Sequence, residues 1–166
     1  MNKMRSRLIW LYQLQSERPG ILDGSDLSAV VKASMVMEKQ KVVDLLDVVL
    51  GELEKERPPA KAVKRILISG SMCSHPDIYK MIENKGAVVV WDDLCSGTRY
   101  FEGLVDEDKE PVQAVAERFT SRYVCPAKHL GVEFQMENLK KLIKTHHVDA
   151  ILFMLLKFCE PFSFDY

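Results

Sequence analysis

The chain has no Cys-x-x-Cys pair, because its four cysteines, Cys73, Cys95, Cys125 and Cys159, are widely spaced. This spacing argues against a zinc ribbon and against a redox dithiol. No apolar run approaches the roughly 20 residues that a helix needs to span a bilayer. Polar residues also interrupt the basic N-terminus before it reaches the length of a signal peptide. We therefore expect a cytoplasmic protein with no membrane contact.

An excess of charge of one sign is also missing. The formal net charge is -1, although 28% of the residues are charged. Lys and Arg form no dense stripe with interleaved aromatic residues, which is the usual footprint of a nucleic-acid-binding surface. We therefore expect no nucleic-acid partner.

The glycine-rich loops of nucleotide-binding proteins are absent too. Gly70 follows an apolar run but leads into Ser-Met-Cys, and the chain contains no P-loop sequence, so neither a dinucleotide site nor an ATPase is indicated. A cysteine nucleophile with a histidine base stays open through Cys73 with His75 or Cys125 with His129. The spacing of Cys125 and His129 is weak evidence for a metal site.

Residues 1–59 are predicted to form a helical segment, which the pair Pro58-Pro59 ends. Apolar side chains in its last helix recur at the helical spacing i, i+3, i+4, i+7 and i+11. These are Val42, Leu45, Leu46, Val49 and Leu53. We expect them to form one buried stripe.

Residues 60–166 alternate between strands and helices. Short apolar runs at 66–68, 88–90 and 150–155 are typical of strands buried in a parallel sheet. The helix between the first two should bury Ile78, Met81 and Ile82. Together these patterns predict an α/β fold, with a Rossmann-like parallel sheet flanked by helices and an N-terminal helical segment.

Two further amphipathic helices are predicted between the second and third strands. The apolar positions of the first are Pro111, Val112, Val115, Ala116 and Phe119, and those of the second are Met136, Leu139, Leu142 and Ile143. After the third strand too few residues remain for the helix that normally follows in such folds. We therefore expect the α/β region to be truncated at its C-terminus or to lack a partner segment.

Three cysteines follow the three predicted strands. Cys73, Cys95 and Cys159 each come shortly after an apolar run. Because parallel strands end at the same edge of a sheet, and α/β proteins build their sites there, we expect these thiols to share one rim. The spacing alone would make all three candidate ligands of one metal centre.

Four segments of the chain resemble one known family. They are Arg65-Ile-Leu-Ile-Ser-Gly-Ser71, Val88-Val-Val-Trp-Asp-Asp-Leu-Cys-Ser-Gly-Thr-Arg-Tyr-Phe101, Val148-Asp-Ala-Ile-Leu-Phe153 and Lys157-Phe-Cys-Glu-Pro161. They look like the C-terminal half of a cluster-binding subunit of the 2-hydroxyacyl-CoA dehydratases and the related benzoyl-CoA reductases. The segments 92–101 and 157–161 are the specific parts of this resemblance.

The resemblance implies a subunit with a 4Fe-4S cluster held by three cysteines, two of them in an N-terminal half that is absent here. Cys159 matches the family's cluster-ligating position, whereas Cys95 matches a recurrent cysteine near the site and Cys73 matches no family motif. The implied partners are that N-terminal half or a second dehydratase subunit, an ATP-dependent activator protein and an acyl-CoA substrate. The expected reaction is radical removal of water from a 2-hydroxyacyl-CoA, under anaerobic conditions.

Five residues are candidates for substrate binding under this reading. Ser69, Ser71 and Thr98 could donate hydrogen bonds, Cys95 could line the pocket, and Arg99 could contact a CoA phosphate. Each of them could instead belong to a surface turn. Two other functions stay open, a benzoyl-CoA reductase subunit and a non-catalytic α/β interaction module.

Overall fold

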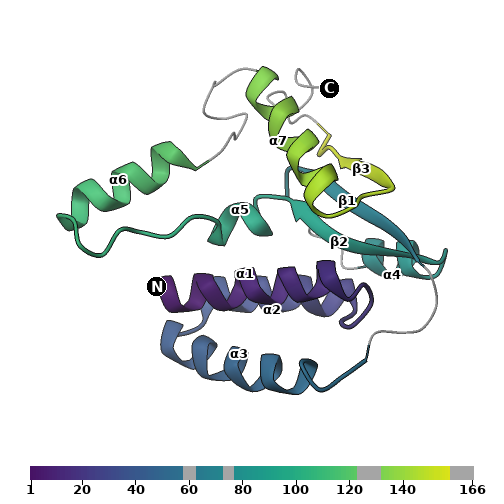
Figure 1. Ribbon diagram of the computed structural model, residues 1–166, viewed down its shortest axis with the longest axis horizontal. Coiled ribbons are helices and arrows are strands. Elements are labelled where there is room, and N and C mark those ends of the chain that lie inside the picture. Colours follow the sequence, from purple (N-terminus) through teal and green to yellow (C-terminus); the bar gives the residue numbers. More distant parts are fainter. Residues whose placement is uncertain (58–62, 73–76, 123–131, 158–166) are drawn as a thin grey trace.

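The computed structural model describes residues 1–57, 63–72, 77–122 and 132–157. Three helices come first, α1 (Asn2–Glu17), α2 (Gly24–Val36) and α3 (Lys39–Leu53). The α/β part follows with β1 (Lys64–Gly70), α4 (Asp77–Glu83), β2 (Ala87–Asp93), α5 (Thr98–Phe101), α6 (Pro111–Ser121), α7 (Val132–Thr145) and β3 (Ala150–Met154). In Figure 1, α1, α2 and α3 lie together below β2, and α7 lies above the sheet.

The predicted α/β fold with a parallel sheet is confirmed. The sheet has three strands in the order β2-β1-β3, and β1 pairs in parallel with both neighbours. The pairing of β1 with β2 shifts between Ile66 and Leu67. Since all three strands run in one direction, their carboxyl ends meet at one edge of the sheet, as expected from the sequence.

The larger of two apolar clusters joins the N-terminal helices to the sheet. It contains Leu8, Leu11 and Tyr12 of α1, and it continues to Phe101 and to the half-buried Trp91 of β2. The Tyr12 ring lies 5.1 Å from the Phe101 ring and 5.4 Å from the Trp91 ring. This packing fixes α1 beside β2. The division of the chain at residue 59 into two domains stays a prediction.

The sequence predicted the wrong buried face for parts of three helices. In α3, Leu45 is exposed, and the buried residues are Val42, Val43, Leu46 and Leu50. In α4, Met81 is exposed and Tyr79 is buried in the second apolar cluster. In α7, Leu139 is buried, but Met136 is exposed. Apolar periodicity locates an amphipathic helix, whereas its neighbours decide which side chains are covered.

Helix α6 forms as predicted, yet the residues predicted to form its buried face are exposed and Ala114 is buried instead. Pro111 begins the helix, and the carboxylate of Glu110 accepts a hydrogen bond from the Gln113 backbone N–H at 2.9 Å. Val112, Val115 and Phe119 are more than half exposed. In Figure 1, α6 lies apart from both the N-terminal helices and the sheet.

None of the helices described is both long and apolar enough to cross a membrane.

Candidate functional site

Backbone hydrogen bonds join the segments that follow the three strands. The Ser71 N–H donates to the Met154 carbonyl at the end of β3, at 3.1 Å. The Cys95 N–H donates to the Ser71 carbonyl, also at 3.1 Å. Ser71 therefore lies between the end of β3 and the loop after β2. The structure places Cys95 at the expected edge, while Cys73 and Cys159 lie outside the described residues.

Gly70 allows β1 and β3 to approach closely at this edge. Its φ is 153°, in a region that residues with a side chain rarely adopt. A Cβ at this position would collide with the Met154 carbonyl oxygen. The residue before Ser71 therefore has to be glycine for the two strands to keep this spacing.

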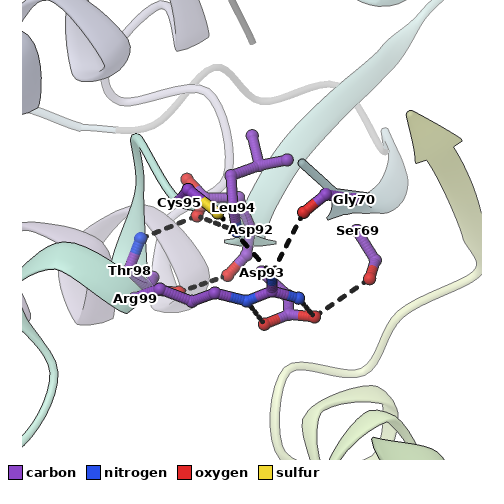
Figure 2. A network of polar contacts seen from close by, with 8 residues as sticks. All are labelled: Ser69, Gly70, Asp92, Asp93, Leu94, Cys95, Thr98 and Arg99. Atoms are coloured by element: carbon purple, nitrogen blue, oxygen red, sulfur yellow. Dashed lines mark hydrogen bonds and ion pairs between the residues drawn. The ribbon is translucent and has the colours of Figure 1, made fainter. Parts of the chain in front are cut away.

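A buried ion pair fixes the loop after β2 (Figure 2). Arg99 donates to both carboxylate oxygens of Asp93, at 2.7 Å from Nε and 2.6 Å from a terminal nitrogen. Its other terminal nitrogen lies 3.2 Å from the Gly70 carbonyl and 3.9 Å from Cys95 Sγ. The Ser69 hydroxyl donates to Asp93 Oδ2 at 3.0 Å. Asp93 and Arg99 thus hold the ends of β1 and β2 and the thiol of Cys95 in one arrangement.

The contacts with Asp93 involve two of the candidate binding residues, Arg99 and Ser69. Arg99 is only 9% exposed, and its guanidinium is bound to Asp93, so its position is set by the protein itself. The Ser69 hydroxyl is bound to the same carboxylate. A contact of Arg99 with a CoA phosphate stays a prediction, and the structure gives Arg99 a positioning role at the edge.

The neighbouring Asp92 organises the turn that leads into α5. It accepts hydrogen bonds from the Thr98 N–H at 2.8 Å and the Leu94 N–H at 3.3 Å, and from the Tyr12 hydroxyl at 2.5 Å. A Cβ on Gly97 would collide with its carboxylate. Burial raises the pKa of Asp92 to about 6, and these hydrogen bonds act in the opposite direction.

Thr98 takes part in the same turn. Its hydroxyl donates to the Asp92 carbonyl at 2.6 Å, in addition to the bond that its N–H makes to the Asp92 side chain. The hydroxyl and the backbone N–H of Thr98 therefore both donate hydrogen bonds to Asp92 in this structure. A contact between Thr98 and the substrate stays a prediction.

Ser71 differs from the other candidates, because its hydroxyl is buried without a hydrogen bond to any of the described residues. The residue is 5% exposed, and Oγ has no hydrogen-bond partner in the part of the chain that is described. Leaving a buried hydroxyl unsatisfied costs about 1–3 kcal/mol. A bound molecule that accepts a hydrogen bond here would remove that cost, so Ser71 and the half-buried Cys95 are the groups best placed to meet a ligand.

A cavity of about 450 Å³ lies between α1, β2 and α7. Trp91, Glu102, Lys141 and His146 are among its lining residues. Burial, followed by the negative charge of Asp93, raises the pKa of Glu102 to about 7. Burial lowers the pKa of His146 to about 4, and its ring stacks on Trp91 with centroids 3.9 Å apart. The cavity thus combines a neutral imidazole with a carboxyl that titrates near neutral pH.

The described residues do not supply a complete set of ligands for a metal cluster. Among them, no group of three or more His, Cys, Asp or Glu side chains could hold a metal ion, and Cys95 is the free cysteine that they contain. One thiol is too few for a cluster that is held by three cysteines. Cys159, the ligand that the resemblance implies, lies outside the described residues.

The sequence indicated the edge but missed the residues that organise it. Asp92, Asp93 and Tyr12 were not expected to have a role at the site. Two adjacent acids at the end of a strand, seven and six residues before an arginine, are a local signal that could have identified Asp93. No local signal could have paired Tyr12 with Asp92, because 80 positions separate them.

Comparison with known proteins identifies the family. All residues from 1 to 166 match the family described as 2-hydroxyglutaryl-CoA dehydratase, D-component. The chain belongs to this family. The expected membership in the 2-hydroxyacyl-CoA dehydratase family is therefore confirmed.

Several curated relatives are beta subunits of dehydratases. The (R)-phenyllactyl-CoA dehydratase beta subunit of Clostridium sporogenes is 26% identical over 92% of this chain and 41% of its own length. The (R)-2-hydroxyglutaryl-CoA dehydratase subunit beta of Acidaminococcus fermentans is 24% identical over 99% of this chain and 45% of its own length. The lactoyl-CoA dehydratase subunit beta of Anaerotignum propionicum is 23% identical over 99% of this chain and 44% of its own length. This member of the D-component family thus spans less than half the length of these relatives.

Proposed function

We propose that the chain is one part of a 2-hydroxyacyl-CoA dehydratase subunit, and that it contributes one edge of the site where water is removed from the substrate. The match of the D-component family to all of residues 1–166 carries this proposal. The relatives named above are dehydratase subunits, which favours dehydration over the reduction of an aromatic acyl-CoA.

The proposed cofactor is a 4Fe-4S cluster shared with the part of the subunit that lies outside the region matched by this chain. We propose Cys159 as the ligand from this chain, because it matches the cluster-binding position of the family. A bound cluster supplies one-electron chemistry. Acid–base groups alone serve this reaction poorly, since the β-proton of a 2-hydroxyacyl thioester is not acidic.

The described residues suggest how the chain would position the substrate. The Ser71 hydroxyl, which lacks a hydrogen-bond partner among the described residues, would donate to the thioester carbonyl or to the 2-hydroxyl group. Cys95 would line the pocket next to it. Asp93 and Arg99 would hold both groups in place, because Arg99 bridges Asp93, the Gly70 carbonyl and Cys95 Sγ. Exclusion of water would also require the part of the subunit that lies outside the region matched by this chain.

Purified alone, the chain is expected to show no dehydratase activity, even with the ATP-hydrolysing activator. Cys159 is the one cluster thiolate that the family resemblance assigns to it. Activity should appear when the chain replaces the matching part of the C. sporogenes beta subunit and is supplied with the partner subunit, activator and ATP. The measurement is the rate of dehydration of a 2-hydroxyacyl-CoA, with an aromatic acyl-CoA as the competing substrate.

Three results would contradict the proposal in different ways. Turnover by the isolated chain would show that no further part is needed. Reduction of the aromatic acyl-CoA without dehydration would favour the benzoyl-CoA reductase reading. A folded assembly without activity toward either substrate would favour the interaction module.

A further inference from the structure

The cavity between α1, β2 and α7 is large enough for a small molecule. Its volume of about 450 Å³ lies within the range of ligand pockets, which is roughly 300–1,000 Å³. Trp91 and Leu142 give the lining an apolar surface. Apart from Ser16 and His146, its polar side chains are Gln13, Glu17, Glu102, Asn138, Lys141 and Thr145. The cavity thus offers an apolar surface together with charges of both signs.

One wall of the cavity is held in a fixed shape. The Ser16 hydroxyl and His146 Nδ1 share a hydrogen bond at 2.8 Å, and the Trp91 ring stacks on the imidazole. Arg65 donates to the backbone carbonyls of Ser16 and His146, at 2.7 Å and 2.6 Å. Because burial lowers the pKa of His146 to about 4, the imidazole is uncharged at neutral pH. Ser16, His146 and Trp91 therefore shape the wall without adding charge to the lining.

Glu102 brings an unsatisfied carboxyl group to the cavity. Its Oε2 is buried and has no hydrogen-bond partner in the described part of the chain. Burial raises the pKa of Glu102 to about 7, although nearby cations lower it. The charged residues that interact with this carboxyl are Asp93, Arg99, Arg118, Arg122 and Lys141. A buried carboxylate is stabilised by a group that both carries positive charge and donates a hydrogen bond.

The arginines near Glu102 already have other partners. Arg99 binds a carboxylate, and Arg118 and Arg122 donate to backbone carbonyls. Lys141 differs from them, because it is exposed and lines the cavity itself. Its charge acts on Glu102, yet it does not satisfy Glu102 Oε2. Lys141 is therefore the cation of the described lining that can turn toward a bound molecule.

The charges of the lining discriminate between classes of ligand. A ligand whose only charge is an ammonium group would be repelled by Lys141. One whose only charge is a carboxylate would be repelled by Glu102 and by Glu17, which is exposed at the lining. A zwitterion avoids both penalties, because each of its charges can face a side chain of opposite sign.

We propose that this cavity binds a small zwitterion of the amino-acid class, with its ammonium group at Glu102 and its carboxylate at Lys141. The ammonium group would supply the hydrogen-bond donor that Glu102 lacks among the described residues. An apolar side chain of the ligand would lie against Trp91 and Leu142. This site goes beyond the proposed function, since it needs neither the cluster nor the sheet edge around Ser71.

Calorimetric titration of the full chain tests the site. The probes are L-valine, L-leucine, L-methionine and L-phenylalanine, and at least one should bind with a dissociation constant of about 1 mM or lower at pH 8. The bound amino acid is then compared with the amine that lacks its carboxylate and with the carboxylic acid that lacks its amino group. Each of these should bind at least about tenfold more weakly, because it leaves one charge of the cavity unmatched.

Two variants remove the charges that we assign to the site. Glu102→Gln keeps the shape of the side chain, and Lys141→Met keeps much of its length, so both should fold, which thermal unfolding checks. Each should weaken binding of the amino acid at least about tenfold. Glu107→Gln and Lys140→Met are the matched controls, because both residues are exposed and neither lines the cavity. The controls should bind within about twofold of the unmodified chain.

The pH dependence separates a direct contact from a structural role of Glu102. Because the carboxylate form binds the ammonium group, affinity should rise about tenfold from pH 6 to pH 8, as a group with a pKa of about 7 ionises. Glu102→Gln should abolish this rise. Absence of binding by all four amino acids at about 10 mM would overturn the proposal. So would equal binding of the amine or the carboxylic acid, or an unchanged affinity and pH profile in Glu102→Gln.

Discussion

Asp93→Ala is expected to destabilise the chain by about 3–5 kcal/mol, because it removes the carboxylate that binds the buried guanidinium of Arg99. Asp93 is 1% exposed, and it accepts bonds from two nitrogens of Arg99 and from the Ser69 hydroxyl. The substitution leaves a charge in a poorly solvated site and a hydroxyl without its acceptor. The measurement is the free energy of urea unfolding, followed by circular dichroism at pH 7.

Asp106→Ala is the matched control. Asp106 also lies near a cation, with 3.6 Å between its Oδ2 and Lys109 Nζ, but both side chains are exposed. Surface ion pairs of this kind contribute little to stability, so this variant should unfold at nearly the same urea concentration as the unmodified chain. If Asp93→Ala behaved like Asp106→Ala, the buried ion pair would not be what holds the edge together.

Gly70→Ala is expected to cost about 3 kcal/mol of stability, since it combines an unfavourable backbone angle with a collision. The φ of Gly70 is 153°, and the added Cβ would meet the Met154 carbonyl oxygen. The ends of β1 and β3 would have to separate, and the bond from the Ser71 N–H to Met154 would be strained. Thermal unfolding and hydrogen exchange of the β1 and β3 amides measure this change.

Gly51→Ala is the control, and we expect it to increase stability rather than lower it. Gly51 lies within α3, and a Cβ there would meet nothing within 4 Å. Replacing an unrestricted helical glycine with alanine stabilises a helix by roughly 0.5–1 kcal/mol. A stability increase in Gly51→Ala with a loss in Gly70→Ala would show that close strand approach causes the effect. Equal changes in the stability of the two variants would contradict that explanation.

The strands could be predicted from the sequence because each is specified locally. The runs at 66–68, 88–90 and 150–155 are short and apolar, and they lie within β1, β2 and β3 apart from the last residue of the third run. Helix faces were harder to predict. Leu45 fits the apolar spacing of α3 as well as Leu46 does, but only Leu46 is covered by the packing in the structure. Periodicity contains no information about where the neighbouring helices lie.

The candidate site, like the helices, could be predicted from the sequence only in part. Ser69, Ser71, Cys95, Thr98 and Arg99 could be assigned to the sheet edge from their positions at or after the ends of two strands. Their contacts could not be assigned, because they depend on how a turn folds back on itself. Asp93 binds Arg99 across a turn in which Asp92 accepts a bond from the Thr98 N–H and lies close to Gly97. Residue types at an edge indicate a location, whereas folded loops decide which groups can reach a ligand.

Iron and sulfide content tests whether the chain belongs to a cluster-bearing dehydratase subunit, as we propose. The chain is placed in the C. sporogenes beta subunit in exchange for the matching part, and the protein is purified without oxygen. Cys159→Ser is compared with Cys73→Ser and Cys95→Ser, because a cluster that loses one of three protein thiolates loses a covalent anchor.

We expect Cys159→Ser to lose most of its iron, its sulfide and its visible cluster absorption. Cys73→Ser should keep all three, and Cys95→Ser should keep the iron even if it loses activity. Full cluster occupancy in Cys159→Ser would contradict the ligand assignment. A folded protein that lacks iron before any substitution would contradict the cluster-bearing function itself.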